Sequence, residues 1–289
     1  MGSKYAKRHT AFTESVLREN ALLNPVKLDR FASETFRSIR EFALGNRPEF
    51  EALALAMQAE EAEDPAEQTR LANEAVRLDP ECVKAYQVLA SACESPQEAL
   101  PYCEQAVAAG ERLLRDLGVN LEEDGVLTGS DVAFGYLQSR SLLARCLIAL
   151  KRVEEGFPHY PALLRLDHDD TVGARYQIVL LALTGGKLEI LDNFLKVYEW
   201  DRSGGWLFVR VLHEFKRGGD SWPARKALKR ANSKNPYIEK ILLDPDYQPR
   251  ADWEEGPDAD DIVEATVYCL DFGPLWIGTE GALDWLASH

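Results

Sequence analysis

The residues best suited to chemistry lie near the middle of the chain. His159, His168, Asp169 and Asp170 are of the types that bind a divalent metal. However, His168 stands where a helical repeat would place its closing proline, and the two aspartates suit the cap of the next helix. We therefore expect neither a metal site nor a bound cofactor.

Cysteines and glycines offer no clearer catalytic pattern. Five cysteines are scattered without a C-x-x-C pair, which favours reduced thiols. Cys82, Cys93 and Cys103 could meet across a helical hairpin, but buried thiols acting as small apolar residues are the simpler interpretation. The stretch Gly185-Gly186-Lys187 lacks the other residues of a phosphate-binding loop. The sequence thus predicts a protein that is not an enzyme.

Composition narrows the class of protein further. The chain has 289 residues, of which 46% are hydrophobic and 28% charged, as in an ordinary globular protein. Its longest strongly apolar run, residues 178–183, is far shorter than the roughly 18 residues of a membrane span. No stretch resembles a secretory signal. We expect a cytoplasmic protein that has no association with membranes.

Charge is distributed unevenly. The formal net charge is -15, which makes nucleic-acid binding through a general basic surface unlikely on electrostatic grounds. Residues 1–40, in contrast, hold eight Lys and Arg against four Asp and Glu, a net of +4. This basic segment either docks on the acidic remainder of the chain or contacts a separate anionic partner.

Helical periodicity organises these residues. Apolar and small side chains mark one helix and then a second in the centre of the chain, at the spacing of a tetratricopeptide repeat of about 34 residues. They are Leu143, Ala144 and Leu147 in the first helix and Gly156, Tyr160 and Leu163 in the second. Such a unit buries its apolar face only by stacking on neighbours. The predicted fold is all-α, a tetratricopeptide-like solenoid of helical hairpins.

Three regions are predicted along the chain. Residues 1–63 form an amino-terminal helical extension, whose helices over 12–23 and 26–44 are separated by Asn24-Pro25. The repeat array occupies 64–243, and 244–289 form an acidic extended segment followed by a helical cap.

Two features are left open by the sequence. The loop over 118–129 is either a binding loop or a tolerated insertion. Trp276 and Trp285 are expected to be exposed near the end of the chain and to belong either to the cap or to a dimer interface, so the oligomeric state is not predicted.

Binding residues are expected on the first helix of each hairpin, because these helices line the concave face of such an array. The candidates are polar and lie off the apolar stripe. They are Lys84, Gln87, Gln138, Ser141, Arg145, Arg175, Gln177, Arg210 and Glu214. The basic members can hold a peptide carboxylate or an acidic segment. Alternatively, Arg145 and Arg175 pair with acidic helices of the protein itself.

A set of sequence motifs lies at 142–150, 159–167, 173–176, 224–228, 235–238 and 281–286. In the tail, an acidic segment and a helix precede Gly-Ala-Leu-Asp-Trp-Leu. Together these motifs resemble bacterial tetratricopeptide proteins related to the suppressor of tumorigenicity seven family, over roughly residues 70 to 287 and most specifically in the tail. The resemblance implies an interaction module without an established reaction.

We therefore predict a scaffold or adaptor that binds a protein or peptide partner in its groove. The alternative is a regulatory protein whose basic amino-terminal region contacts nucleic acid or another anionic partner.

Overall fold

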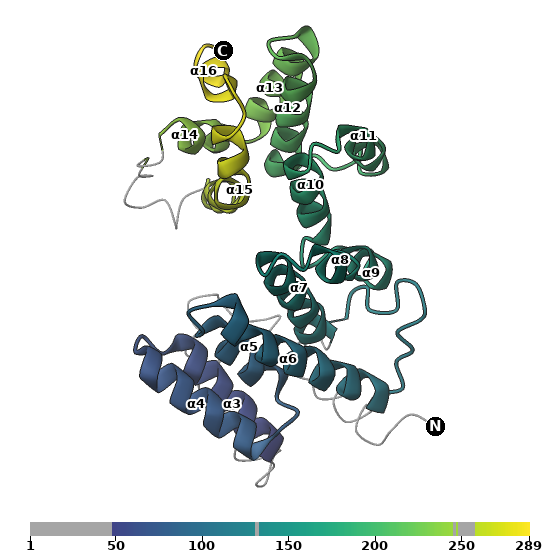
Figure 1. The fold of residues 1–289 in the computed structure, drawn as a ribbon, viewed down its shortest axis with the longest axis vertical. Helices are drawn as coiled ribbons and strands as arrows, with labels where there is room; N and C mark the ends of the chain where they lie inside the picture. The colour runs from purple at the N-terminus through teal and green to yellow at the C-terminus, as the bar shows by residue number, and fades with distance from the viewer. Residues whose placement is uncertain (1–47, 131–132, 245–246, 248–257) are drawn as a thin grey trace, which may run out of the picture. The chain divides into compact units, whose positions relative to one another are not determined.

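The computed structural model describes residues 48–130, 133–244, 247 and 258–289. Within these ranges the chain is helical, with helices α3 to α16 and no strand, which confirms the predicted all-α class (Figure 1). The chain divides into two compact units, residues 1–174 and 175–289. The predicted helices over 12–23 and 26–44 lie outside the described residues, as does most of the acidic segment after residue 244.

The first hairpin consists of α3 (Pro48–Glu61) and α4 (Pro65–Leu78). Asp64 caps α4 by accepting a hydrogen bond from the Ala66 amide, and Pro65 occupies the first helical position. Alanines such as Ala56 and Ala75 are fully buried between the helices. Their small side chains allow the two backbones to approach closely.

The second hairpin consists of α5 (Val83–Ser91) and α6 (Pro96–Asp116). Ser95 caps α6, since its hydroxyl accepts the Glu98 amide at 3.4 Å. Gly110 of α6 faces Tyr136 of the next helix, α7 (Phe134–Ala149), and a β-carbon at Gly110 would lie 3.0 Å from the Tyr136 side chain. Glycine therefore lets α6 and α7 pack in contact.

The third group begins with α7 (Phe134–Ala149), followed by α8 (Val153–Gly156) and α9 (His159–Leu166). The sequence predicts one second helix here, but the structure breaks it at Phe157-Pro158. The physical reason is Pro161, which has no amide hydrogen for the carbonyl of Phe157 and whose ring would crowd it. Gly156 packs so closely on α7 that a β-carbon would lie 2.8 Å from the Ala144 carbonyl.

The long loop over 118–129 is fastened to the end of α9. The amides of Gly125 and Leu127 donate to the carbonyls of Arg165 and Leu166 at 2.7 and 2.9 Å. Arg165 in turn donates to the carbonyls of Leu121 and Glu122. Leu127 is buried. The loop thus has a packing role, and a binding role for it remains a prediction.

The second unit contains α10 from Arg175 onward (α10 spans Ala174–Thr184), α11 (Leu188–Val197), α12 (Gly204–Gly218) and α13 (Trp222–Lys234). Apolar spacing in the sequence predicts helices over 175–183, 188–198, 206–216 and 223–231, and the four observed helices lie close to these bounds. Their common core is rich in aromatic rings, with Trp206 and Phe208 fully buried. The ring of Trp206 contacts those of Tyr176, Phe194 and Tyr198, and the ring of Phe208 contacts those of Tyr268 and Trp276.

The end of the chain covers this core with α14 (Tyr237–Leu243), α15 (Ala259–Ile277) and α16 (Ala282–Ala287). Helix α14 was not predicted. The expected exposure of Trp276 and Trp285 is wrong, because both side chains are buried in the core of this unit. They therefore belong to the cap and are unavailable to a dimer interface.

Glu264 of α15 ties these elements together. Its carboxylate accepts from the Gly205 amide at the start of α12 and from the side-chain amide of Asn235. The described helices include none that is both long and apolar enough to cross a membrane.

Candidate functional site

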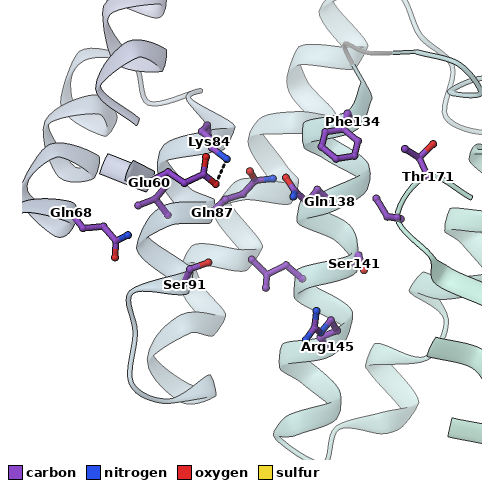
Figure 2. Close-up of a pocket in the computed structure, with 13 residues that line it drawn as sticks. Glu60, Gln68, Lys84, Gln87, Ser91, Phe134, Gln138, Ser141, Arg145 and Thr171 are labelled. Carbon is purple, nitrogen blue, oxygen red and sulfur yellow. Dashed lines mark hydrogen bonds and ion pairs between the residues drawn. The ribbon is translucent and has the colours of Figure 1, made fainter. Parts of the chain in front are cut away.

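An open groove of about 410 Å³ lies in the first unit, across α3, α4, α5 and α7 and the loop after α9 (Figure 2). Polar side chains from four helices and an apolar floor line it. Its residues are Glu60, Gln68, Lys84, Gln87, Val88, Ser91, Phe134, Gln138, Ser141, Leu142, Arg145, Thr171 and Val172. Five of the predicted binding residues are among them.

Helical spacing explains why these side chains share the groove. On α5 they recur three and then four residues apart, at Lys84, Gln87 and Ser91. On α7 they recur in the same way from Phe134 through Gln138 to Arg145. Each helix therefore turns one face to the groove, and its other side carries buried residues such as Leu89 on α5 and Leu147 on α7.

Lys84 is not a free cation. Its ammonium forms an ion pair with the Glu60 carboxylate at 2.5 Å, drawn as a dashed line in Figure 2. Both side chains are partly accessible to solvent, so the pair contributes little to stability and can open at small cost. This rim of the groove therefore offers both charges to a ligand.

The side-chain amide of Gln87 is already hydrogen-bonded within the protein. Its side-chain nitrogen donates to the Gly135 carbonyl at 2.9 Å and to the Ser139 hydroxyl at 2.8 Å. Because both amide hydrogens are used between α5 and α7, Gln87 positions the walls of the groove instead of reaching into it. Gln138, in contrast, is exposed on the groove face of α7.

Arg145 is the cation best placed for a ligand. Its side chain is exposed and lines the groove on α7. None of the described carboxylates forms an ion pair with it, and Figure 2 shows its guanidinium without a bond to any residue drawn. An arginine in this state can accept a carboxylate ligand through two parallel hydrogen bonds.

Apolar side chains also line the groove. Val88 is buried, and Leu142 and Val172 are partly exposed. Phe134 is 43% exposed at one end. The groove thus combines apolar contacts with a cation, as a site for an extended peptide requires.

Arg175 and Asp201, both in the second unit, form a nearly buried ion pair at 2.9 Å. The guanidinium also stacks over the rings of Tyr176, Tyr198 and Trp206. The alternative stated for Arg175, pairing within the protein, is therefore what the structure contains.

The three remaining candidates also lie in the second unit. Gln177 donates to Asp271 at 3.4 Å, and Arg210 donates to the carbonyls of Leu195 and Tyr198 at the end of α11. Arg210 thereby caps that helix. Glu214 is half-buried on α12. These three residues are not among those that line the groove of the first unit.

The two histidines considered as metal ligands, His159 and His168, form hydrogen bonds within the protein. His159 accepts a hydrogen bond from Arg140, and burial lowers the pKa of its imidazole. The His168 backbone amide donates to Thr128 of the long loop. In the described part of the chain, no group of His, Cys, Asp and Glu is arranged to hold a metal ion.

The cysteines are all free. Cys82 and Cys103 are buried, and burial raises the pKa of the Cys103 thiol to about 12. This thiol therefore stays protonated near neutral pH and behaves as a small apolar group.

Sequence reasoning missed Glu60 and Phe134. Glu60 was overlooked because residues 49–63 were assigned to the amino-terminal extension, whereas α3 pairs with α4 and faces the groove. Phe134 is apolar and therefore falls outside the polar positions that are expected to bind a partner. Its spacing of four residues from Gln138 could have identified it.

No family model matches this chain, and no curated protein matches it.

Proposed function

We propose that this protein is a non-enzymatic interaction module that binds a peptide segment of a protein partner in the groove of its first unit. The observation that carries the proposal is the exposed Arg145, which has no described ion-pair partner and lines the groove together with apolar side chains. An extended peptide with a carboxylate next to an apolar side chain fits this combination.

The proposal includes a tetratricopeptide-like solenoid and the relationship to the suppressor of tumorigenicity seven family. Consecutive packed helix pairs support the solenoid, since α3, α5 and α7, the first helices of successive pairs, all contribute to the groove. In such arrays the first helices form the binding face.

Affinity capture from a lysate of the source organism tests the proposal. The wild type is compared with Arg145→Glu, and with Arg115→Glu as a matched control, because Arg115 is exposed on α6 outside the groove. We expect a protein that the wild type and Arg115→Glu retain and that Arg145→Glu loses. Equal retention by all three would contradict the proposed site.

A further inference from the structure

Helix α15 is apolar on two opposite sides. Its inner side packs in the core of the second unit through residues such as Phe272 and Trp276. Its outer side carries Val263, Val267, Leu270 and Ile277, which are 51%, 55%, 74% and 73% exposed. We call these four residues the outer stripe (Figure 1 shows α15 near the end of the chain).

The outer stripe has the spacing of a helix-binding surface. Its residues follow one another at intervals of four, three and seven positions, which places them on one side of the helix. Helices that are apolar all round are normally buried on all sides. A contiguous apolar strip left in solvent is typical of an interaction surface.

Charge indicates the kind of partner. Residues 258–289 contain seven carboxylate side chains and neither Lys nor Arg. Asp260 and Asp271 lie along one edge of the outer stripe, and Asp260 is exposed. A second copy of the chain would bring the same negative edges together, which is unfavourable. An anionic membrane surface would be repelled for the same reason.

We propose that the outer stripe of α15 docks an amphipathic helix from a partner protein. The partner helix carries apolar residues at intervals of three and four positions and Lys or Arg along its edge. Its apolar side chains cover Val267 and Leu270, while its cations face Asp260 and Asp271. This surface lies in the second unit and does not depend on the peptide function of the groove.

Two synthetic peptides of three heptads test the proposal. Each has leucine at the first and fourth heptad positions and alanine elsewhere, except that the fifth and seventh positions are lysine in one peptide and glutamate in the other. Fluorescence anisotropy measures the binding of each labelled peptide to the full chain. We expect the lysine peptide to bind about tenfold or more tightly than the glutamate peptide.

Two double variants locate the binding. Leu270→Ser with Ile277→Ser removes exposed apolar side chains from the outer stripe, and Val197→Ser with Trp222→Ser removes equally exposed ones from α11 and α13. We expect the stripe variant to weaken binding of the lysine peptide about tenfold or more, and the control variant to leave it unchanged. All four positions are exposed, so both variants should fold, which circular dichroism checks.

Three results would overturn the proposal. The lysine peptide would fail to bind, or both peptides would bind equally, or the stripe variant would bind as tightly as the control. Sedimentation velocity tests a second copy of the chain as the occupant: if the wild type dimerises and the stripe variant does not, the outer stripe binds a second copy and the proposal is wrong.

Discussion

Two glutamines on facing helices of the groove differ in what surrounds their amides. Gln87 is buried and donates both amide hydrogens to α7, whereas Gln138 is exposed on α7 itself. Removing a buried amide leaves its hydrogen-bond partners with one donor fewer and no water to replace it. The partners of an exposed amide can bind water instead. Residue type and spacing alone do not distinguish the two, because both positions face the groove side of their helices.

Replacing each glutamine with leucine measures this difference. We expect Gln87→Leu to lower the free energy of unfolding by about 1 to 3 kcal/mol, since the Ser139 hydroxyl and the Gly135 carbonyl lose a donor. The control Gln138→Leu should change it by less than about 0.5 kcal/mol. Urea denaturation checks both, and equal effects would contradict a structural role for Gln87.

Arg145 and Arg175, both predicted to bind a partner, also have different roles. Arg175→Ala should lower the free energy of unfolding by about 3 to 5 kcal/mol, because it leaves the buried Asp201 carboxylate without its guanidinium. Arg145→Ala should change it by less than about 0.5 kcal/mol. Thermal unfolding followed by circular dichroism makes the comparison, and a stable Arg175→Ala would show that the ion pair is dispensable. Only Arg145 is therefore suitable for a charge-reversal test of binding.

At the scale of elements, the start of α12 is the point where three parts of the second unit meet. Gly204 and Gly205 lie against Asn235, which follows α13, and against Glu264 of α15. The Glu264 carboxylate accepts amide hydrogens there, where a helix favours negative charge. Glycine is needed because Asn235 and Glu264 occupy the space of a side chain.

Alanine at Gly204 tests this junction. Its β-carbon would collide with Asn235 and the Glu264 carboxylate, so we expect Gly204→Ala to lower the free energy of unfolding by about 1 to 3 kcal/mol. In the control Gly135→Ala, the β-carbon would meet only Val83 at 3.7 Å, an ordinary contact in a helix. That variant should be neutral or stabilising by up to about 1 kcal/mol. Chemical denaturation measures the free energy of unfolding of both variants. A Gly204→Ala variant more stable than Gly135→Ala would contradict close packing at the start of α12.

Periodicity predicts the hairpin helices well and their interruptions less well. The helices over 175–183, 188–198 and 223–231 are found close to their expected bounds, since apolar spacing and proline or glycine signals agree there. The break between α8 and α9 was missed, although Pro158 and Pro161 mark it. Helix α14 was missed because its seven residues are too short for a periodic signal.

The site was predicted only in part, for a related reason. Spacing identifies which residues share a helix face, and five candidates do line one groove. It does not tell whether a neighbouring helix has already used a side chain, as with Gln87 and Arg175. Tertiary partners far apart in the sequence decide that, and a single sequence does not reveal them.

For the whole molecule, the buried His213 makes the free energy of unfolding depend on pH. Burial lowers the pKa of His213 below its ordinary value, with Arg217 acting in the same direction and Asp192 and Glu214 opposing. The unfolded chain then takes up protons before the folded chain does as the pH falls. The folded state is therefore not destabilised by His213 above the unfolded pKa of about 6.5, and it loses stability progressively as the pH falls below that value.

We expect the free energy of unfolding to fall between about pH 7.5 and about pH 5, with His213 contributing part of the slope. Urea denaturation across this range measures it. His213→Gln cannot take up the proton, so its slope should be smaller than that of the wild type. An unchanged slope would assign the pH dependence to other groups, such as His159.

Site-specific photo-crosslinking tests whether a partner protein contacts the groove of the first unit. A photoreactive phenylalanine derivative is placed at Gln138 in the groove or at Gln105, which is exposed on α6 outside it. The chain is irradiated in an extract of its source cells, and the adducts are identified by mass spectrometry. We predict a discrete adduct from Gln138 that is absent from Gln105 and is lost when Arg145→Glu is added. The same adducts from both positions, or none from Gln138, would contradict the account.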